Sequence, residues 1–224
     1  MAPSDRRQYG RQTDQFAAGR AQCHPRTEPD KTALDEYCIC YIQSIPTATP
    51  ARAGQVPMQA APLPDNEAQR LAALYALLIL DTPPEERFDR IAAFAAAEFD
   101  VPIVLVTLLD TDRQWFKARI GLDACETGRD MSFCGHAILR EEIMVVPDAL
   151  DDPRFDDNPL VTGAPFIRFY AGAPLQLASG ERLGTLCLID RRPRTLDALE
   201  LGILSTLRDL AVMELSGSTG DDHG

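Results

Sequence analysis

The chain of 224 residues is 45% hydrophobic and 25% charged, a composition typical of a globular protein with a buried core. Its formal net charge of −12 argues against a nucleic-acid partner, because binding to phosphates requires clustered lysine and arginine side chains. Six sparse cysteines do not indicate a disulfide scaffold, and no apolar stretch reaches the roughly 20 residues that cross a bilayer, so we expect a cytoplasmic protein without membrane contact.

Residues 1–57 differ in composition from everything that follows. They mix arginine, glutamine, proline and threonine without a sustained period, and they end in a segment rich in proline, alanine and threonine. Two interpretations fit this pattern: a disordered arm, or an upstream extension of a protein that begins at Met58. We favour the second, and we expect one domain over residues 58–215 followed by a polar tail over residues 216–224.

Two helices are predicted at the start of this domain. From Glu67 onward, leucines recur at intervals of three and four, which indicates an amphipathic helix. These leucines are Leu71, Leu74, Leu77 and Leu78. Thr82 is placed to cap a second helix, with Pro83 at its first helical position and Phe99 near its end.

Strands dominate the middle of the chain. Residues 103–109 are apolar on both faces and are therefore expected at the centre of a sheet. Residues 114–120 form the second strand of a hairpin, with Lys117 and Arg119 on the face opposite its apolar side chains. We expect a loop over residues 121–130, a short helix over 132–139 and a strand over 143–146.

A long irregular segment, 147–165, precedes the last part of the domain. Loops of this length are typically binding loops or disordered segments. Strands over residues 168–177 and 182–189 then flank a tight turn. An apolar stripe after them predicts a last helix. This helix either packs on its own sheet or, as we favour, forms the contact between two copies of a homodimer. The stripe consists of Leu196, Leu199, Ile203, Leu207 and Leu210. This order of elements predicts an α+β domain around an antiparallel sheet.

Seven short segments, taken in order, resemble the motifs of bacterial GAF domains. They are Leu80–Asp89, Ser132–Ile138, Val145–Ala149, Asp152–Phe155, Asn158–Gly163, Ile167–Gly172 and Gly184–Asp190. The resemblance implies a GAF-like central six-stranded antiparallel sheet with helices on both faces and a pocket under the loops. It also implies a sensory module that binds a small molecule or registers redox state ahead of a histidine kinase or diguanylate cyclase. Output motifs of those enzymes are absent from the sequence, so we expect the signal to pass through the terminal helices to a separately encoded partner.

Candidate ligand contacts follow from the resemblance and from the residue types. They are Phe133, Cys134, His136, Asp148, Arg154, Phe155, Asn158, Arg168 and Tyr170. A thiol at the start of a helix favours its reactive thiolate, although we favour the simpler interpretation that Cys134 packs inward. Arg168 either pairs with an anionic ligand or neutralises an aspartate of the 147–165 loop. Aspartates of that loop, with Arg154 and Phe155, are read as a turn-rich lid rather than a cation site.

Two other functions are compatible with the sequence. Cys125 and Cys134 resemble part of the free methionine-R-sulfoxide reductases, but the third cysteine of those enzymes is missing from residues 151–170. Cys187 lies in the final strand and is expected to face the core. The other alternative is a structural dimerisation module without a ligand. The sequence identifies no cofactor, no metal ligand set and no catalytic residue, so an enzyme is the less favoured interpretation.

Overall fold

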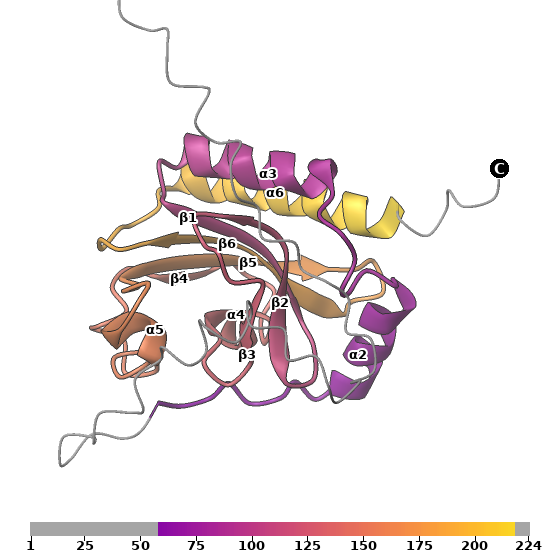
Figure 1. Cartoon of the computed structure of the whole chain (residues 1–224), viewed down its shortest axis with the longest axis horizontal. Helices are drawn as coiled ribbons and strands as arrows, with labels where there is room; N and C mark the ends of the chain where they lie inside the picture. The colour runs from indigo at the N-terminus through magenta and orange to yellow at the C-terminus, as the bar shows by residue number, and fades with distance from the viewer. Residues whose placement is uncertain (1–57, 218–224) are drawn as a thin grey trace, which may run out of the picture.

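One antiparallel sheet of six strands, in the order β3-β2-β1-β6-β5-β4, organises the computed structural model, which describes residues 58–217. The strands are β1 (Ile103–Leu109), β2 (Arg113–Ile120), β3 (Glu126–Gly128), β4 (Met144–Val146), β5 (Phe169–Gln176) and β6 (Arg182–Asp190). Helices cover both faces of the sheet, as the view in Figure 1 shows. The predicted fold class, with its six strands, is therefore confirmed.

The strand β1 is buried at every position because it lies between β2 and β6 and is covered on both faces. Side chains of successive residues point to opposite faces, so the sheet separates two apolar cores. Val104, Val106 and Leu108 belong to one core, and Leu105 and Leu109 belong to the other. The sequence pattern predicted this central position correctly.

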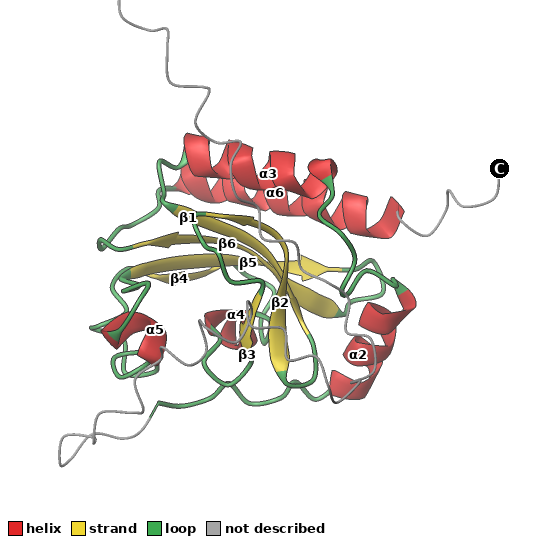
Figure 2. Ribbon diagram, viewed as in Figure 1, coloured by secondary structure: helices red, strands yellow, loops and turns green. Residues whose placement is uncertain are grey.

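Five helices complete the described part of the chain. They are α2 (Glu67–Ala76), α3 (Glu86–Glu98), α4 (Phe133–Ala137), α5 (Pro159–Thr162) and α6 (Ala198–Gly217). The long helices α3 and α6 lie side by side on one face, while the short helices α4 and α5 lie on the other (Figure 2). None of these helices is long and apolar enough to cross a membrane.

The predicted end of the first helix and the predicted beginning of the second need correction. Leu78 is 83% exposed and has a φ of 51°, because α2 ends before it and the chain turns. Thr82 does not cap α3, which begins at Glu86. The Thr82 hydroxyl instead donates to the Ile79 carbonyl at 2.7 Å and accepts from the Lys117 ammonium at 2.7 Å.

The second strand also differs from its prediction. The alternation places Lys117 on the face opposite the apolar side chains of its strand, yet that face is not polar: the Lys117 side chain is buried beneath α3 and contacts the Phe88 and Trp115 rings. A register irregularity between β1 and β2 at Val106 accompanies this arrangement. The predicted loop 121–130 contains the edge strand β3, which was missed because a three-residue strand has no measurable alternation.

The last helix is real, but its buried face is rotated relative to the predicted stripe. Its buried residues are Leu204, Leu207, Ala211 and Leu215. Leu199 and Leu210, which belonged to the predicted stripe, are exposed by 72% and 41%. The helix also continues to Gly217, into the segment that we assigned to a polar tail.

The segment before α2 crosses the face of the sheet that carries α4 (Figure 1). We call residues 58–65 the strap. The backbone N–H of Met58 donates to the Asp157 carboxylate at 2.7 Å, and the carbonyl of Gln59 lies 3.0 Å from Nε2 of His136. The predictions made for residues 1–57 and 218–224 lie outside the described residues.

Candidate functional site

A cluster of polar groups is buried between α4 and the sheet. Its centre is Sγ of Cys134, which accepts a hydrogen bond from the Thr185 hydroxyl at 3.0 Å and one from the Tyr170 hydroxyl at 3.3 Å. The Thr107 hydroxyl lies 3.1 Å from that of Thr185 and extends the cluster to β1. The Cys187 thiol also hydrogen-bonds with Cys134, so four side chains from three strands meet around one sulfur.

Strand geometry explains why these groups meet. Thr185 and Cys187 are separated by two positions on β6 and therefore point to the same face. Thr107 is the partner of Thr185 on β1, and Tyr170 lies on β5. Ser132 caps α4 by accepting from the Gly135 N–H at 3.2 Å, which holds the first turn of the helix over this part of the sheet.

The hydrogen bonds favour a negative charge on Cys134. Burial by itself raises the pKa of this thiol, but hydrogen bonds from Cys187, Thr107, Thr185 and Tyr170 outweigh burial and lower the pKa to about 6. Burial and the neighbouring Cys134 raise the pKa of Cys187 well above its usual value. The shared environment thus moves the two thiol pKa values in opposite directions, down for Cys134 and up for Cys187.

Aromatic rings close the cluster on the side of the 147–165 loop. Phe133 and Phe155 stack with centroids 3.9 Å apart, and the Tyr170 ring lies 5.1 Å from Phe133. His136 packs edge-on against Phe155 at 5.0 Å. Side chains thus fill the space between the sheet and the loop, which is where the sequence placed a ligand pocket.

His136 connects the site to the strap. It is only 8% exposed, and burial lowers its pKa while the hydrogen bond to the Gln59 carbonyl partly opposes that change. Gly135 beside it has no Cβ, and a Cβ there would lie 3.1 Å from that of Ala61. The strap therefore packs directly on α4, the helix that carries Cys134.

The 147–165 loop is held by ion pairs and by Asn158. Arg154 pairs with Asp152 through Nε at 2.9 Å, and Arg168 pairs with Asp148 through Nε at 2.7 Å. These arginines lower the pKa of both carboxyl groups. Asn158 caps α5 and donates to the Met131 carbonyl at 2.9 Å, which ties the loop to the segment before α4. The loop contains the turns that the sequence predicted, and Arg168 forms an ion pair with one of its aspartates. We call this loop the lid, and its role over a ligand stays a prediction.

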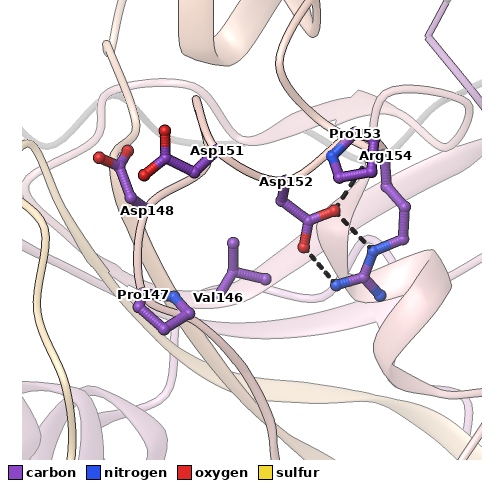
Figure 3. Close-up of a pocket in the computed structure, with 7 residues that line it drawn as sticks. All are labelled: Val146, Pro147, Asp148, Asp151, Asp152, Pro153 and Arg154. Carbon is purple, nitrogen blue, oxygen red and sulfur yellow. Dashed lines mark hydrogen bonds and ion pairs between the residues drawn. The ribbon is translucent and has the colours of Figure 1, made fainter.

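An open depression of about 520 Å³ lies on the outer side of this lid. Asp148 and Asp151 lie on one side of it, and the Asp152–Arg154 pair lies on the other (Figure 3). The remaining lining residues are Val146, Pro147 and Pro153.

The structure therefore divides the predicted site residues into two groups. Phe133, Cys134, His136, Phe155 and Tyr170 are buried together under the lid. Asp148, Arg154 and Arg168 lie at or near the surface, and Asn158 fastens the lid between the groups. Ligand binding by either group stays a prediction.

Sequence reasoning missed three members of the cluster. Thr107, Thr185 and Cys187 lie inside apolar strands, where the predicted role was packing. A signal was present in the spacing, because Thr185 and Cys187 alternate on β6 and so share a face. Within residues 58–217, no group of three or more histidine, cysteine or acidic side chains is arranged to hold a metal ion.

Comparison with known proteins places these observations in a family. The model of the GAF domain matches residues 83–215. A cyclic di-GMP phosphodiesterase, PA2567 of Pseudomonas aeruginosa strain PAO1, is 48% identical over 157 residues, which are 70% of this chain and 25% of that protein. The chain thus spans a quarter of the length of this curated relative.

Solved structures share the fold at low sequence identity. The GAF domain of a phosphoenolpyruvate-protein phosphotransferase from Acinetobacter has a TM-score of 0.51 and 18% identity, covering 67% of this chain and 95% of that domain. A free methionine-R-sulfoxide reductase from Neisseria meningitidis has a TM-score of 0.50 and 19% identity, covering 72% of this chain and 98% of that protein. From its matched residues and its six-stranded sheet, this chain belongs to the GAF domain family.

Proposed function

We propose that this GAF domain is a regulatory module that receives a chemical input on the α4 side of its sheet and controls an enzyme of cyclic di-GMP turnover. The observation that carries the proposal is the 48% identity to a quarter of a cyclic di-GMP phosphodiesterase. The matched domain makes up only a quarter of that protein, which suits a regulatory role beside a separate catalytic domain.

The two faces of the sheet support a division between input and output. The thiol cluster and the lid occupy one face, and α3 and α6 occupy the other. Strand β6 belongs to both, because Cys187 points to the cluster while Leu186 and Leu188 pack in the core under α6. A change that shifts β6 or β5 at the cluster acts on α6 through the same strands.

We place the output surface on the outer side of α3 and α6. Phe94, Leu210 and Met213 are exposed by 53%, 41% and 60%. Three large apolar side chains on adjacent helices favour association with another protein surface. The occupant that we propose is a second copy of the chain, so that the input alters how two α6 helices pair.

A domain exchange tests the regulatory role. In the Pseudomonas aeruginosa phosphodiesterase, the matched region is either deleted or replaced by residues 58–217 of this chain, and hydrolysis of cyclic di-GMP is measured. We expect deletion to change the rate and replacement to restore it. Equal rates from the parent, the deletion and the exchange would refute the proposal.

Variants of the exchange protein locate the output. We expect Leu210→Glu to behave like the deletion, because it places a charge on the α3–α6 surface. Leu63→Glu is the matched control, since Leu63 is 63% exposed on the strap, away from α3 and α6. Native mass spectrometry of the full chain from its own host would show whether a small molecule accompanies the domain.

A further inference from the structure

The Cys134 and Cys187 side chains are contributed by elements far apart in the sequence, yet their thiols meet in the interior. Cys134 is 2% exposed and Cys187 is fully buried. Both are free cysteines, and each hydrogen-bonds with the other. Purely apolar packing does not account for this arrangement, because the three hydroxyl side chains of the cluster serve the same sulfur.

The environment of the two sulfurs differs in a way that suits a reactive pair. Cys134 receives hydrogen bonds from Thr185 and Tyr170, which stabilise its thiolate. The Cys187 thiol lies 3.6 Å from the Leu105 carbonyl, and burial together with the neighbouring Cys134 favours its protonated form. One sulfur is thereby prepared to attack, and the other retains the proton that a leaving group requires.

We infer that Cys134 and Cys187 form a redox-active pair that a hydroperoxide converts into a disulfide between α4 and β6. The inference rests on the proposed function in one respect, since the pair supplies the chemical input of the regulatory module. It names the class of input, a two-electron oxidant, and the residues that register it.

The chemistry balances in two steps. The Cys134 thiolate attacks one oxygen of the peroxide, so that an S–O bond forms, the O–O bond breaks and the second oxygen leaves as hydroxide or an alkoxide, which takes a proton from solvent water. Cys134 is then a sulfenic acid, oxidised by two electrons. The Cys187 sulfur attacks the Cys134 sulfur, the S–S bond forms, and the sulfenic hydroxyl leaves as water with the Cys187 proton.

Because Cys134 is buried, the rate of its oxidation depends on how readily the oxidant reaches its sulfur. The strap and the lid cover the cluster, so the oxidant reaches Cys134 only when these segments are displaced for a moment. Only small oxidants fit this requirement, and bulky disulfides do not. Because α4 has five residues and carries the contact with the strap, it is the element that a new bond to β6 would displace.

Peptide mapping of the full chain tests the inference directly. Trypsin cleaves after arginine, and it places Cys134 in the peptide 130–140 and Cys187 in the peptide 183–191. The protein is reduced, freed of reductant, treated with hydrogen peroxide and alkylated before digestion. We expect a linked peptide that weighs two hydrogens less than the sum of its parts and that disappears with dithiothreitol.

Three variants sharpen the test. In Cys187→Ser, we expect the 130–140 peptide to accumulate sulfinic and sulfonic acid in place of the linked species, because no resolving thiol is present. Tyr170→Phe removes one donor to the thiolate and should slow linkage several-fold at neutral pH. Tyr75→Phe is the matched control, since that hydroxyl contacts Asp110 and Thr111 on the surface, and its rate should equal that of the parent.

Two results would overturn the inference. One is a native protein whose two peptides remain unmodified by peroxide while the same peptides react in denaturant. The other is linkage of Cys134 to a cysteine other than Cys187. The mapping requires no partner enzyme, so its result is independent of the domain exchange, and either proposal can fail without the other.

Discussion

Lys117 shows most clearly how a single residue departs from its sequence pattern. Its ammonium group is enclosed by the Thr82 hydroxyl at 2.7 Å, the Pro83 carbonyl at 3.0 Å and the Glu85 carboxylate. Burial lowers its pKa, and Glu85 opposes the change. No side chain caps the beginning of α3. Lys117 instead holds the segment that leads into the helix through these three contacts.

We expect Lys117→Met to destabilise the domain by about 2 kcal/mol, because three hydrogen-bonding groups lose their partner. Urea denaturation of the full chain measures this difference. Arg90→Met is the matched control, since Arg90 and its partner Glu86 are both exposed on α3, and its effect should stay within about 0.5 kcal/mol. Equal losses from both variants would contradict a structural role for Lys117.

At the scale of elements, strand β5 positions the Tyr170 hydroxyl because Gly172, two residues further on, has no side chain. The Tyr170 ring lies across Gly172, and a Cβ on Gly172 would lie 2.1 Å from the tyrosine hydroxyl oxygen. Glycine at this position therefore allows the hydroxyl to reach Cys134. Strand geometry and thiol chemistry depend on the same residue.

We expect Gly172→Ala to destabilise the domain by about 1–3 kcal/mol and to raise the pKa of Cys134, because the displaced Tyr170 hydroxyl no longer stabilises the thiolate. Ultraviolet absorbance of the thiolate, followed against pH, measures the second effect. Gly202→Ala is the matched control: no atom lies within 4 Å of a Cβ there, so the substitution in α6 should leave the titration unchanged.

The Cys134 thiol also determines how the free energy of unfolding changes with pH. The pKa of Cys134 falls from 9.0 to about 6 on folding, so its thiolate stabilises the native state at alkaline pH. This contribution decreases as the pH is lowered from about 9 and is lost through the folded pKa near 6. In Gly172→Ala, the free energy of unfolding should therefore vary less over this range than in the parent.

At the scale of the whole molecule, the two faces of the sheet carry different surfaces. The strap and the lid lie on one face, and α3 and α6 on the other carry exposed apolar side chains. We expect the full chain to form a dimer through the second face, and Met213→Glu to shift it toward monomer because a charge enters an apolar contact. Sedimentation velocity measures this change.

Leu63→Glu serves again as the control, since it adds a charge to the strap rather than to α3 or α6. It should sediment as the parent does. A dimer that survives Met213→Glu unchanged would show that another surface joins the two copies.

Local patterns determined much of this protein in advance. The apolar run at Ile103–Leu109, the hairpin after it and the order of the later strands follow from alternation and from turn residues, which act between neighbours in the chain. The same short segments identified the family. These features required no knowledge of which elements touch.

Only the tertiary structure decided which side chains meet. Tyr170 and Thr185 are 36 and 51 positions from Cys134 in sequence, so no local pattern places their hydroxyls on its sulfur. The inward position of Lys117 and the rotated face of α6 likewise depend on the elements packed against them. Burial and hydrogen bonding are set by partners distant in the chain, and for that reason the thiol cluster emerged from the fold rather than from the sequence.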